Sequence, residues 1–181
     1  MRETRLALMI IFSAVLAAVS ACGATHAGRP AADPGRPHLS RADHHWLDAA
    51  HQANMAETQA GHLGQLDGGS SAIRSAGATM LRDHYALDSE LIKVANAMKL
   101  KLPQALTYEQ ANTIDRLSQE SGVQFDHDFT ASMMTAHQTM IAATRYEIAH
   151  GSSPAVVRLA RTALPVLLKH LRMLEAAAST G

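Results

Sequence analysis

Four ionisable side chains interrupt the apolar faces of the helices expected in this chain: Glu57, His84, His137 and His170. Burying such groups is costly unless they pair with one another or bind a metal. At about 1.5 Å per residue, measured from the end of the expected bundle that carries two short turns, all four fall within about two helical turns. Helix axes about 8–10 Å apart would let these side chains meet.

One carboxylate and three imidazoles are suitable ligands for Fe, Zn or Cu. The alternative is a metal-free layer of hydrogen-bonded groups that only sets the register of the helices. Met133, Met134 and Met140 lie near His137, and thioether plus imidazole suits Cu(I) outside the cytoplasm. Methionine at helical spacing is also a common filler of apolar cores. The residues alone leave these interpretations open.

Other polar residues flank the four candidate ligands. Asp83 and Glu147 could orient an imidazole from behind, or could be surface charges. Further accessory candidates that share faces with the histidines are Asp88, Asp126 and Met133. The other histidines of the domain are expected to be solvated, because they fall on different helix faces: His44, His45, His51, His62, His127 and His150.

Four long helices are expected to position these side chains. Aromatic residues are few (4%) and alanine, leucine and methionine are common, which favours helices over sheets. Apolar periodicity predicts helices over 41–66, 71–98, 107–150 and from Pro154 onward. The third should break near Gly122, and the fourth should kink at Pro165. Short connections at Asp67–Ser70 and Gly151–Ser153 force antiparallel neighbours, so we predict an all-α, up-down-up-down four-helix bundle.

The first 21 residues have the order of a secretory signal: a positively charged start, an apolar run and a small-residue cut site. The run from Leu6 to Val19 is too short for a spanning helix, which needs about 20 apolar residues. Cys22, the one cysteine, closes Val19-Ser20-Ala21-Cys22 and resembles the lipobox of bacterial lipoproteins. We therefore expect export and a lipid anchor on Cys22, with the domain on the extracytoplasmic or periplasmic side of the membrane. An ordinary export signal with an incidental thiol is the alternative.

The charge of the remaining chain excludes some partners. Of the 16 basic and 16 acidic side chains, two arginines and one glutamate lie in residues 1–21, which leaves a net charge near minus one. No basic field exists to hold nucleic acid or an anionic membrane surface. Residues 23–39 are rich in glycine, alanine and proline, which is typical of a tether. We predict a signal peptide over 1–21, a lipidated, disordered tether over 22–39 and a helical domain over 40–181.

Several motifs of the expected helices together resemble a known family. They are Glu57 before a small-residue run, Arg82-Asp83-His84, Phe125-Asp126, Met133 with His137, and Leu164-Pro165 followed by His170. Over roughly Asp43 to Ala176 they resemble a family of bacterial envelope lipoproteins. Its members are labelled outer membrane proteins, and their shared domain has no known function and is grouped with ferritin-like bundles. The resemblance implies a ferritin-like four-helix fold and carries no established activity.

The sequence contains no positive indication of an enzyme. It lacks a nucleophile with a base and an orienting group, a glycine-rich phosphate loop, and a close carboxylate pair suited to hydrolysis. Ferritin-type di-iron proteins use Glu-x-x-His on two helices. Leu81, Met134 and Leu167 stand three residues before the three candidate histidines, so ferroxidase or dioxygen chemistry is not expected.

Overall fold

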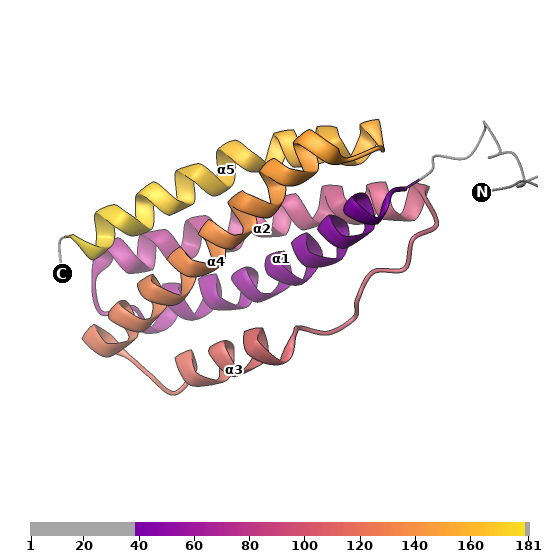
Figure 1. The fold of residues 1–181 in the computed structure, drawn as a ribbon. Coiled ribbons are helices and arrows are strands. Elements are labelled where there is room, and N and C mark those ends of the chain that lie inside the picture. Colours follow the sequence, from indigo (N-terminus) through magenta and orange to yellow (C-terminus); the bar gives the residue numbers. More distant parts are fainter. Residues whose placement is uncertain (1–38, 180–181) are drawn as a thin grey trace, which may run out of the picture. The chain divides into compact units, whose positions relative to one another are not determined.

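The computed structural model describes residues 39–179, which form five α-helices and no β-strand. The helices are α1 (Arg41–Asp67), α2 (Ser71–Ala97), α3 (Tyr108–Leu117), α4 (Gly122–His150) and α5 (Pro154–Ala178) (Figure 1). The all-α prediction is confirmed for this part of the chain. The predicted signal peptide, Cys22 and the tether up to residue 38 lie outside the described residues. Among residues 39–179, no helix combines the length and apolarity that crossing a membrane requires.

Polar side chains fix where the helices begin. Ser40 and Asp43 form a reciprocal capping box at the start of α1, and Thr107 and Gln110 form another at the start of α3. The hydroxyls of Ser70 and Ser153 accept hydrogen bonds from the third backbone N–H of α2 and of α5. Pro154 follows at the first position of α5, where its missing N–H is not needed. These starts match the expected helices closely.

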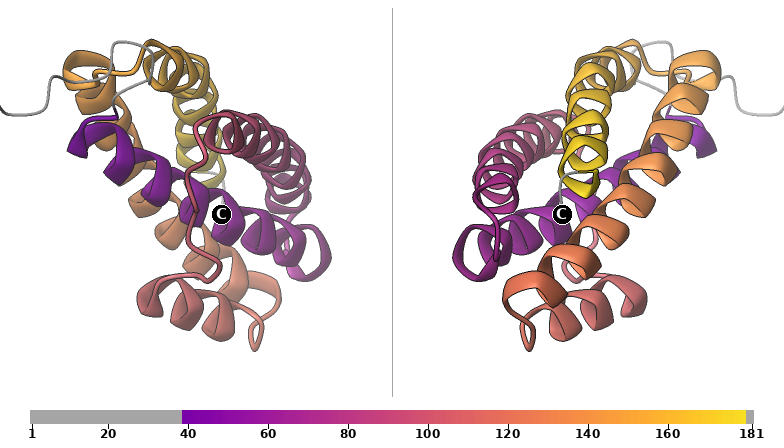
Figure 2. Two further views of the ribbon diagram at one scale, coloured as in Figure 1. Left: turned by 90° about the vertical axis from the view of Figure 1, so that its right-hand side faces the viewer. Right: turned by 90° about the vertical axis from the view of Figure 1, so that its left-hand side faces the viewer.

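The region expected to be one interrupted helix is instead two separate helices. α3 ends at Leu117, and α4 begins at Gly122, whose φ of 65° lies in the left-handed region that glycine adopts without steric penalty. The chain therefore turns a corner between them. α3 lies outside the four long helices and contacts α1 and α4 (Figure 2). The expectation of four helices is thus corrected to four long helices and one short one.

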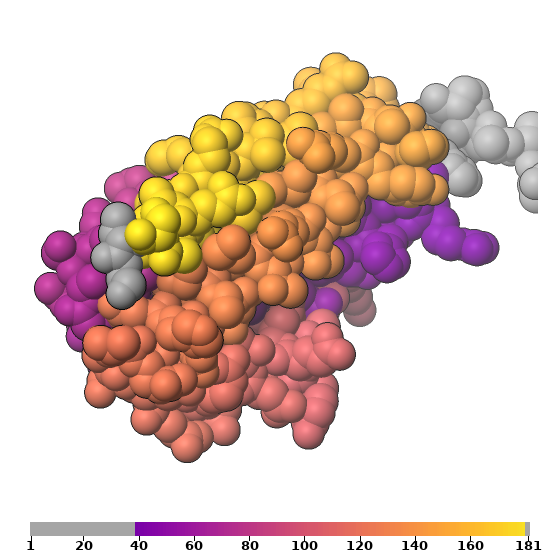
Figure 3. All heavy atoms as spheres, turned by 60° about the vertical axis from the view of Figure 1, so that its left-hand side comes forward, coloured from indigo at the N-terminus to yellow at the C-terminus, as the bar shows by residue number. Residues whose placement is uncertain are grey.

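The four long helices pack as two hairpins, α1 with α2 and α4 with α5, and α1 also contacts α4 while α2 contacts α5. The space-filling view shows α4 and α5 side by side, with α3 against one end of α4 (Figure 3). α5 continues through Pro165. Proline has no N–H, so the backbone carbonyl of Arg161 lacks its helical partner, but both residues are exposed and water can bind this carbonyl. A kink at this proline stays a prediction.

Glycines let α1 and α2 approach very closely. A Cβ added to Gly61 would lie 2.7 Å from the backbone nitrogen of Leu81, and one added to Gly77 would lie 2.6 Å from that of Gln65. Real Cβ atoms do not come so close to backbone atoms, so only glycine fits here. Because Gly61 stands one helical turn after Glu57, this contact helps to hold Glu57 against α2.

Two apolar clusters fill the core, and the four candidate ligands lie between them in each helix. One cluster contains Ala53, Leu91, Met140 and Leu167, and the other contains Ala60, Met80, Met133 and Leu174. On α4, for example, His137 stands between Met133 and Met140. The same order holds on α1, α2 and α5. The structure thus places one polar layer across an otherwise apolar core.

Candidate metal centre

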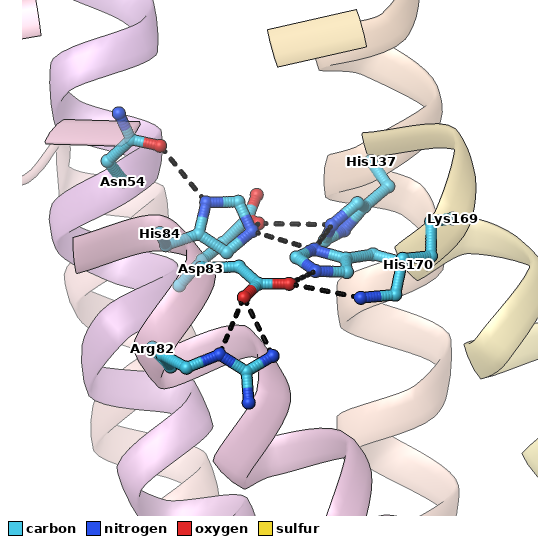
Figure 4. Close-up of polar contacts among 8 residues, drawn as sticks. Asn54, Arg82, Asp83, His84, His137, Lys169 and His170 are labelled. Atoms are coloured by element: carbon cyan, nitrogen blue, oxygen red, sulfur yellow. Dashed lines mark hydrogen bonds and ion pairs between the residues drawn. The ribbon is translucent and has the colours of Figure 1, made fainter. Parts of the chain in front are cut away.

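One ionisable side chain from each long helix reaches the same point in the core: Glu57 (α1), His84 (α2), His137 (α4) and His170 (α5). Each is at most 1% exposed. Oε2 of Glu57 lies 2.6 Å from Nε2 of His84 and 3.3 Å from Nε2 of His137. Nδ1 of His170 lies 3.2 Å from Nε2 of His84 and 3.3 Å from Nε2 of His137 (Figure 4). The structure therefore brings all four predicted side chains together. We call these four atoms, Oε2 of Glu57, Nε2 of His84, Nε2 of His137 and Nδ1 of His170, the inner atoms of the cluster.

The second nitrogen of each imidazole contacts a hydrogen-bond acceptor outside the cluster. The three contacts are His84 Nδ1 to Asn54 Oδ1 at 3.0 Å, His137 Nδ1 to the Met133 carbonyl at 2.9 Å, and His170 Nε2 to Asp83 Oδ2 at 3.0 Å. Carbonyl and carboxylate oxygens only accept hydrogen bonds, so each of these outer nitrogens carries the hydrogen and donates it. This assignment fixes which nitrogen of each neutral ring is left with a lone pair.

The inner nitrogens therefore direct lone pairs at one another. A neutral imidazole has one N–H and one lone pair, and here the N–H is always on the outside. Ring nitrogens of the three histidines lie within 4.8 Å of one another, and Oε2 of Glu57 lies close to those of His84 and His137. Neither oxygen of that carboxylate has a hydrogen-bond partner among the described residues. With all three rings neutral, four electron-rich atoms facing each other in a buried space repel one another unless a cation or a shared proton lies between them.

The protonation states of the cluster follow from burial and from the neighbouring charges. Burial raises the pKa of Glu57, but attraction to His84 and His137 outweighs it and brings that pKa to about 2. Burial lowers the pKa of His137, and it lowers the pKa of His170 to about 4 despite the hydrogen bond with Asp83. Near pH 7 the carboxyl is therefore ionised while these two imidazoles are neutral, which is the state that ligates metals.

Asp83 joins the cluster to the surface. Its Oδ2 accepts the hydrogen bond from His170 and lies 3.3 Å from Nζ of Lys169, while its Oδ1 lies 2.9 Å from Nε of Arg82 (Figure 4). Burial raises the pKa of Asp83, but the hydrogen bonds with His170 and Arg82 bring it down to about 2. A carboxylate in this position orients the imidazole ring and would strengthen it as a metal ligand, which is one of the two roles that the sequence left open for Asp83.

A second polar chain leaves the cluster through Asn54, a residue that sequence reasoning missed. Nδ2 of Asn54 lies 3.5 Å from Oδ1 of Asp88, and Nδ1 of His51 lies 2.7 Å from the same oxygen. His51 is only 7% exposed, which corrects the expectation that it is solvated. It is buried because α2 also covers this side of α1. Asn54 could have been found from its position, three residues before Glu57 on the same helix face.

The other accessory candidates do not reach the cluster. Glu147 stands ten residues after His137, about 15 Å along α4, and interacts with Asp43 at the far end of the domain. Asp126 lies about 16 Å from the cluster along the same helix and instead accepts hydrogen bonds from the backbone N–H groups of Gly69 and Ser70. Asp126 was expected near the site because it shares a face with His137, but a shared face does not imply a shared height. For Glu147 the sequence left open a role behind an imidazole or a surface charge, and the structure buries it away from the cluster.

The methionines near His137 belong to the apolar core. Met133 contributes its backbone carbonyl to the site, whereas its side chain packs in one apolar cluster and that of Met140 packs in the other. This arrangement fits core-filling methionines better than a thioether site for Cu(I). The remaining histidines, as expected, are exposed: His44, His45, His62, His127 and His150.

Comparisons with known proteins concern the family and the fold of this chain. In a search of solved structures the chain matches the crystal structure of a DUF305 fragment from Deinococcus radiodurans, with a TM-score of 0.68 and 16% identity, over 77% of this chain and 97% of that one. At this identity the likeness concerns the fold alone. No curated protein matches. A family model described as domain of unknown function (DUF4142) matches residues 28–177. The chain therefore belongs to the DUF4142 family.

Proposed function

We propose that this protein binds one divalent transition metal ion in its core, through Glu57, His84, His137 and His170. Among Fe, Zn and Cu, tetrahedral Zn²⁺ fits the inner atoms best. A tetrahedron with Zn–N bonds of about 2.0–2.1 Å has edges of about 3.3 Å. Three of the four inner contacts are 3.2–3.3 Å long.

The single observation that carries this proposal is the direction of the three imidazoles. Each donates its outer N–H to an acceptor, so each presents its lone pair to the same point as the Glu57 carboxylate. Metal-ligating histidines commonly donate the other ring N–H to a carboxylate or a carbonyl in this way. A layer that only set helix register would be expected to pair donors with acceptors inside the core.

The test is the metal content of the full chain, purified without a histidine tag and with Cys22→Ser so that no thiol contributes. We expect about one zinc per chain after zinc loading and desalting. His137→Ala or His170→Ala should lose this zinc, while His44→Ala, at an exposed position, should keep it. Zinc retained equally by all four proteins would place the metal elsewhere and contradict the proposal.

One distance favours a second candidate, a metal-free polar layer. Oε2 of Glu57 and Nε2 of His84 are 2.6 Å apart, which is shorter than a tetrahedral edge. One proton could be held between these atoms once the ring turns into line, and the layer would then act only in fixing helix register. The two candidates differ in one property: a proton-bridged layer needs no metal for its full thermal stability.

The location of the protein is a further part of the proposal. We infer export and a lipid anchor on Cys22 from Val19-Ser20-Ala21-Cys22 at the end of a signal-like segment. Cells that express the wild-type chain should incorporate radiolabelled lipid into it and retain it in the membrane fraction. Cys22→Ser should abolish both. Unchanged membrane retention of Cys22→Ser would contradict the anchor.

The finer fold assignment is also proposed: a ferritin-like, up-down-up-down four-helix bundle to which α3 is added. Two hairpins with short connections, packed against each other through α1–α4 and α2–α5, support it.

A further inference from the structure

A small cavity lies next to two of the proposed ligands. Its volume is about 20 Å³, and it is bordered by Glu57 and His84 on one side. A cavity needs roughly 10–15 Å³ to hold a water molecule, so this one has room for a single small molecule. Its other walls come from the apolar cluster toward the start of α1, with Trp46, Leu91 and Ala163 among them.

The polar side chains that reach the cavity are already engaged, except for Glu57. Asn54 accepts from His84 and contacts Asp88, and Oγ1 of Thr144 accepts a hydrogen bond of 3.1 Å from Nε1 of Trp46. The carboxylate of Glu57 is the one group there with no hydrogen-bond partner among the described residues. A molecule in this cavity would therefore meet apolar carbon, the carboxylate of Glu57 and the proposed metal position.

We propose that the bound metal has one exchangeable coordination position that faces this cavity, and that it takes a small neutral ligand, from water to a diatomic molecule in size. This inference rests on the metal site proposed above. Four-coordinate zinc-type sites can expand to five ligands, and the fifth would enter on the side of Glu57 and His84. His137 and His170 do not border the cavity, so they stay on the opposite side of the ion.

The surroundings of the cavity exclude other classes of ligand. An anion would be desolvated among apolar side chains and repelled by the ionised carboxylate of Glu57. Larger molecules do not fit, because nearly all the lining side chains are buried and closely packed. A water molecule would have only the metal and Glu57 as polar partners, fewer than most buried waters have. A neutral diatomic molecule, which needs no hydrogen bonds, suits the space best.

The probe is nitric oxide, added without oxygen to the Co(II)-loaded Cys22→Ser chain. Nitric oxide adds to Co(II) by forming one Co–N bond and requires no protein ligand to leave. Co(II) has visible absorption bands that report its coordination number, and divalent cobalt binds the same nitrogen and oxygen ligands as zinc. We expect these bands to appear on metal loading and to change when nitric oxide is added.

Two variants distinguish an effect on the cavity from an effect on metal binding. Ala163→Val fills the cavity from α5 without touching a ligand, and it should keep the cobalt bands but lose the response to nitric oxide. Ala142→Val, at an exposed position of α4, should keep both. Cobalt bands in the wild-type chain that ignore nitric oxide would overturn this inference and leave the metal site standing. Failure to bind cobalt at all would overturn the metal site and this inference together.

Discussion

Two buried glutamates in this domain, Glu57 and Glu147, are driven to opposite charge states by their neighbours. Both are at most 1% exposed. Glu57 faces three imidazoles, and its pKa falls to about 2. Glu147 is buried next to Asp43, and burial together with that second acid raises its pKa to about 8. One is a carboxylate suited to a cation, and the other is a carboxylic acid near neutral pH.

The second glutamate belongs to a structural arrangement. Asp43 accepts hydrogen bonds from the backbone N–H groups of Ser40, Ser152 and Ser153, which join the start of α1 to the turn between α4 and α5. Burial raises the pKa of Asp43, but these hydrogen bonds and those of the Ser152 and Ser40 hydroxyls bring it well below its usual value. Since Asp43 keeps its charge, Glu147 keeps its proton. Burial of a glutamate alone therefore does not mark a site; the kind of neighbour does.

The largest expected effect comes from Glu57→Gln compared with Glu147→Gln. At zinc concentrations about 100 times the Kd, a bound metal raises the free energy of unfolding by about 2.7 kcal/mol. Glu57→Gln should lose most of this gain, because the anionic ligand is gone, and Glu147→Gln should retain it. Thermal melts of both variants and the wild type, with zinc and with chelator, measure the difference. If zinc stabilised Glu57→Gln as much as the wild type, Glu57 would not be a metal ligand and the two glutamates would not differ in this respect.

The next effect concerns the close approach of α1 and α2 beside the cluster. Gly77→Ala would place a Cβ 2.6 Å from the backbone nitrogen of Gln65 and 2.7 Å from the carbonyl oxygen of Gly61. Overpacking of this kind destabilises by about 1–3 kcal/mol. Chemical denaturation of the chelator-treated protein should show this loss, while Gln59→Ala on the exposed face of α1 should change little. Full stability of Gly77→Ala would mean that the helices can separate at no cost.

A smaller effect is expected from Asp83→Asn. The amide oxygen still accepts the hydrogen bond from His170, but the loss of charge makes the imidazole a weaker ligand. Residues behind a metal ligand typically change affinity by about 10–100-fold, and we expect the lower end because Asp83 is partly exposed. Competition with a metal indicator measures the affinity for zinc. Asp115→Asn on α3 is the control. If Asp83→Asn and Asp115→Asn bound zinc equally well, Asp83 would have no role behind His170 and would be a surface charge.

The last expected effect is a pH dependence of opposite sign at the two glutamates. The pKa of Glu147 is raised from 4.5 to about 8, so its stability contribution is present below pH 4.5 and is lost as pH rises through 8. Glu147→Gln should therefore gain stability relative to the wild type as pH rises. The pKa of Glu57 is lowered from 4.5 to about 2, so its contribution is lost as pH falls between these values. Denaturation curves across this range check both slopes, and equal slopes for wild type and Glu147→Gln would contradict the first.

The sequence predicts much of this arrangement because helical periodicity specifies both face and height. Glu57, His84, His137 and His170 interrupt apolar stripes at similar heights, and the structure brings them together. Helix starts were also predictable, since Ser40, Ser70, Thr107 and Ser153 have the side chains that cap helices.

What the sequence could not show depends on how helices pack in three dimensions. The corner at Gly122 could have been a break in one straight helix, because a glycine is compatible with either. His51 is buried by the position of α2, which the periodicity of α1 alone does not contain. Asp126 was expected near the site because its face was considered without its height.

Anomalous diffraction at the zinc edge, from crystals of the zinc-loaded Cys22→Ser chain, shows whether the core of the domain holds a metal ion. We predict one strong peak in the core, between the inner atoms of Glu57, His84, His137 and His170. The outer nitrogens of the three rings should still contact Asn54, Met133 and Asp83. Zinc found at exposed histidines such as His44 or His150, with no peak in the core, would contradict the metal site and favour the metal-free layer.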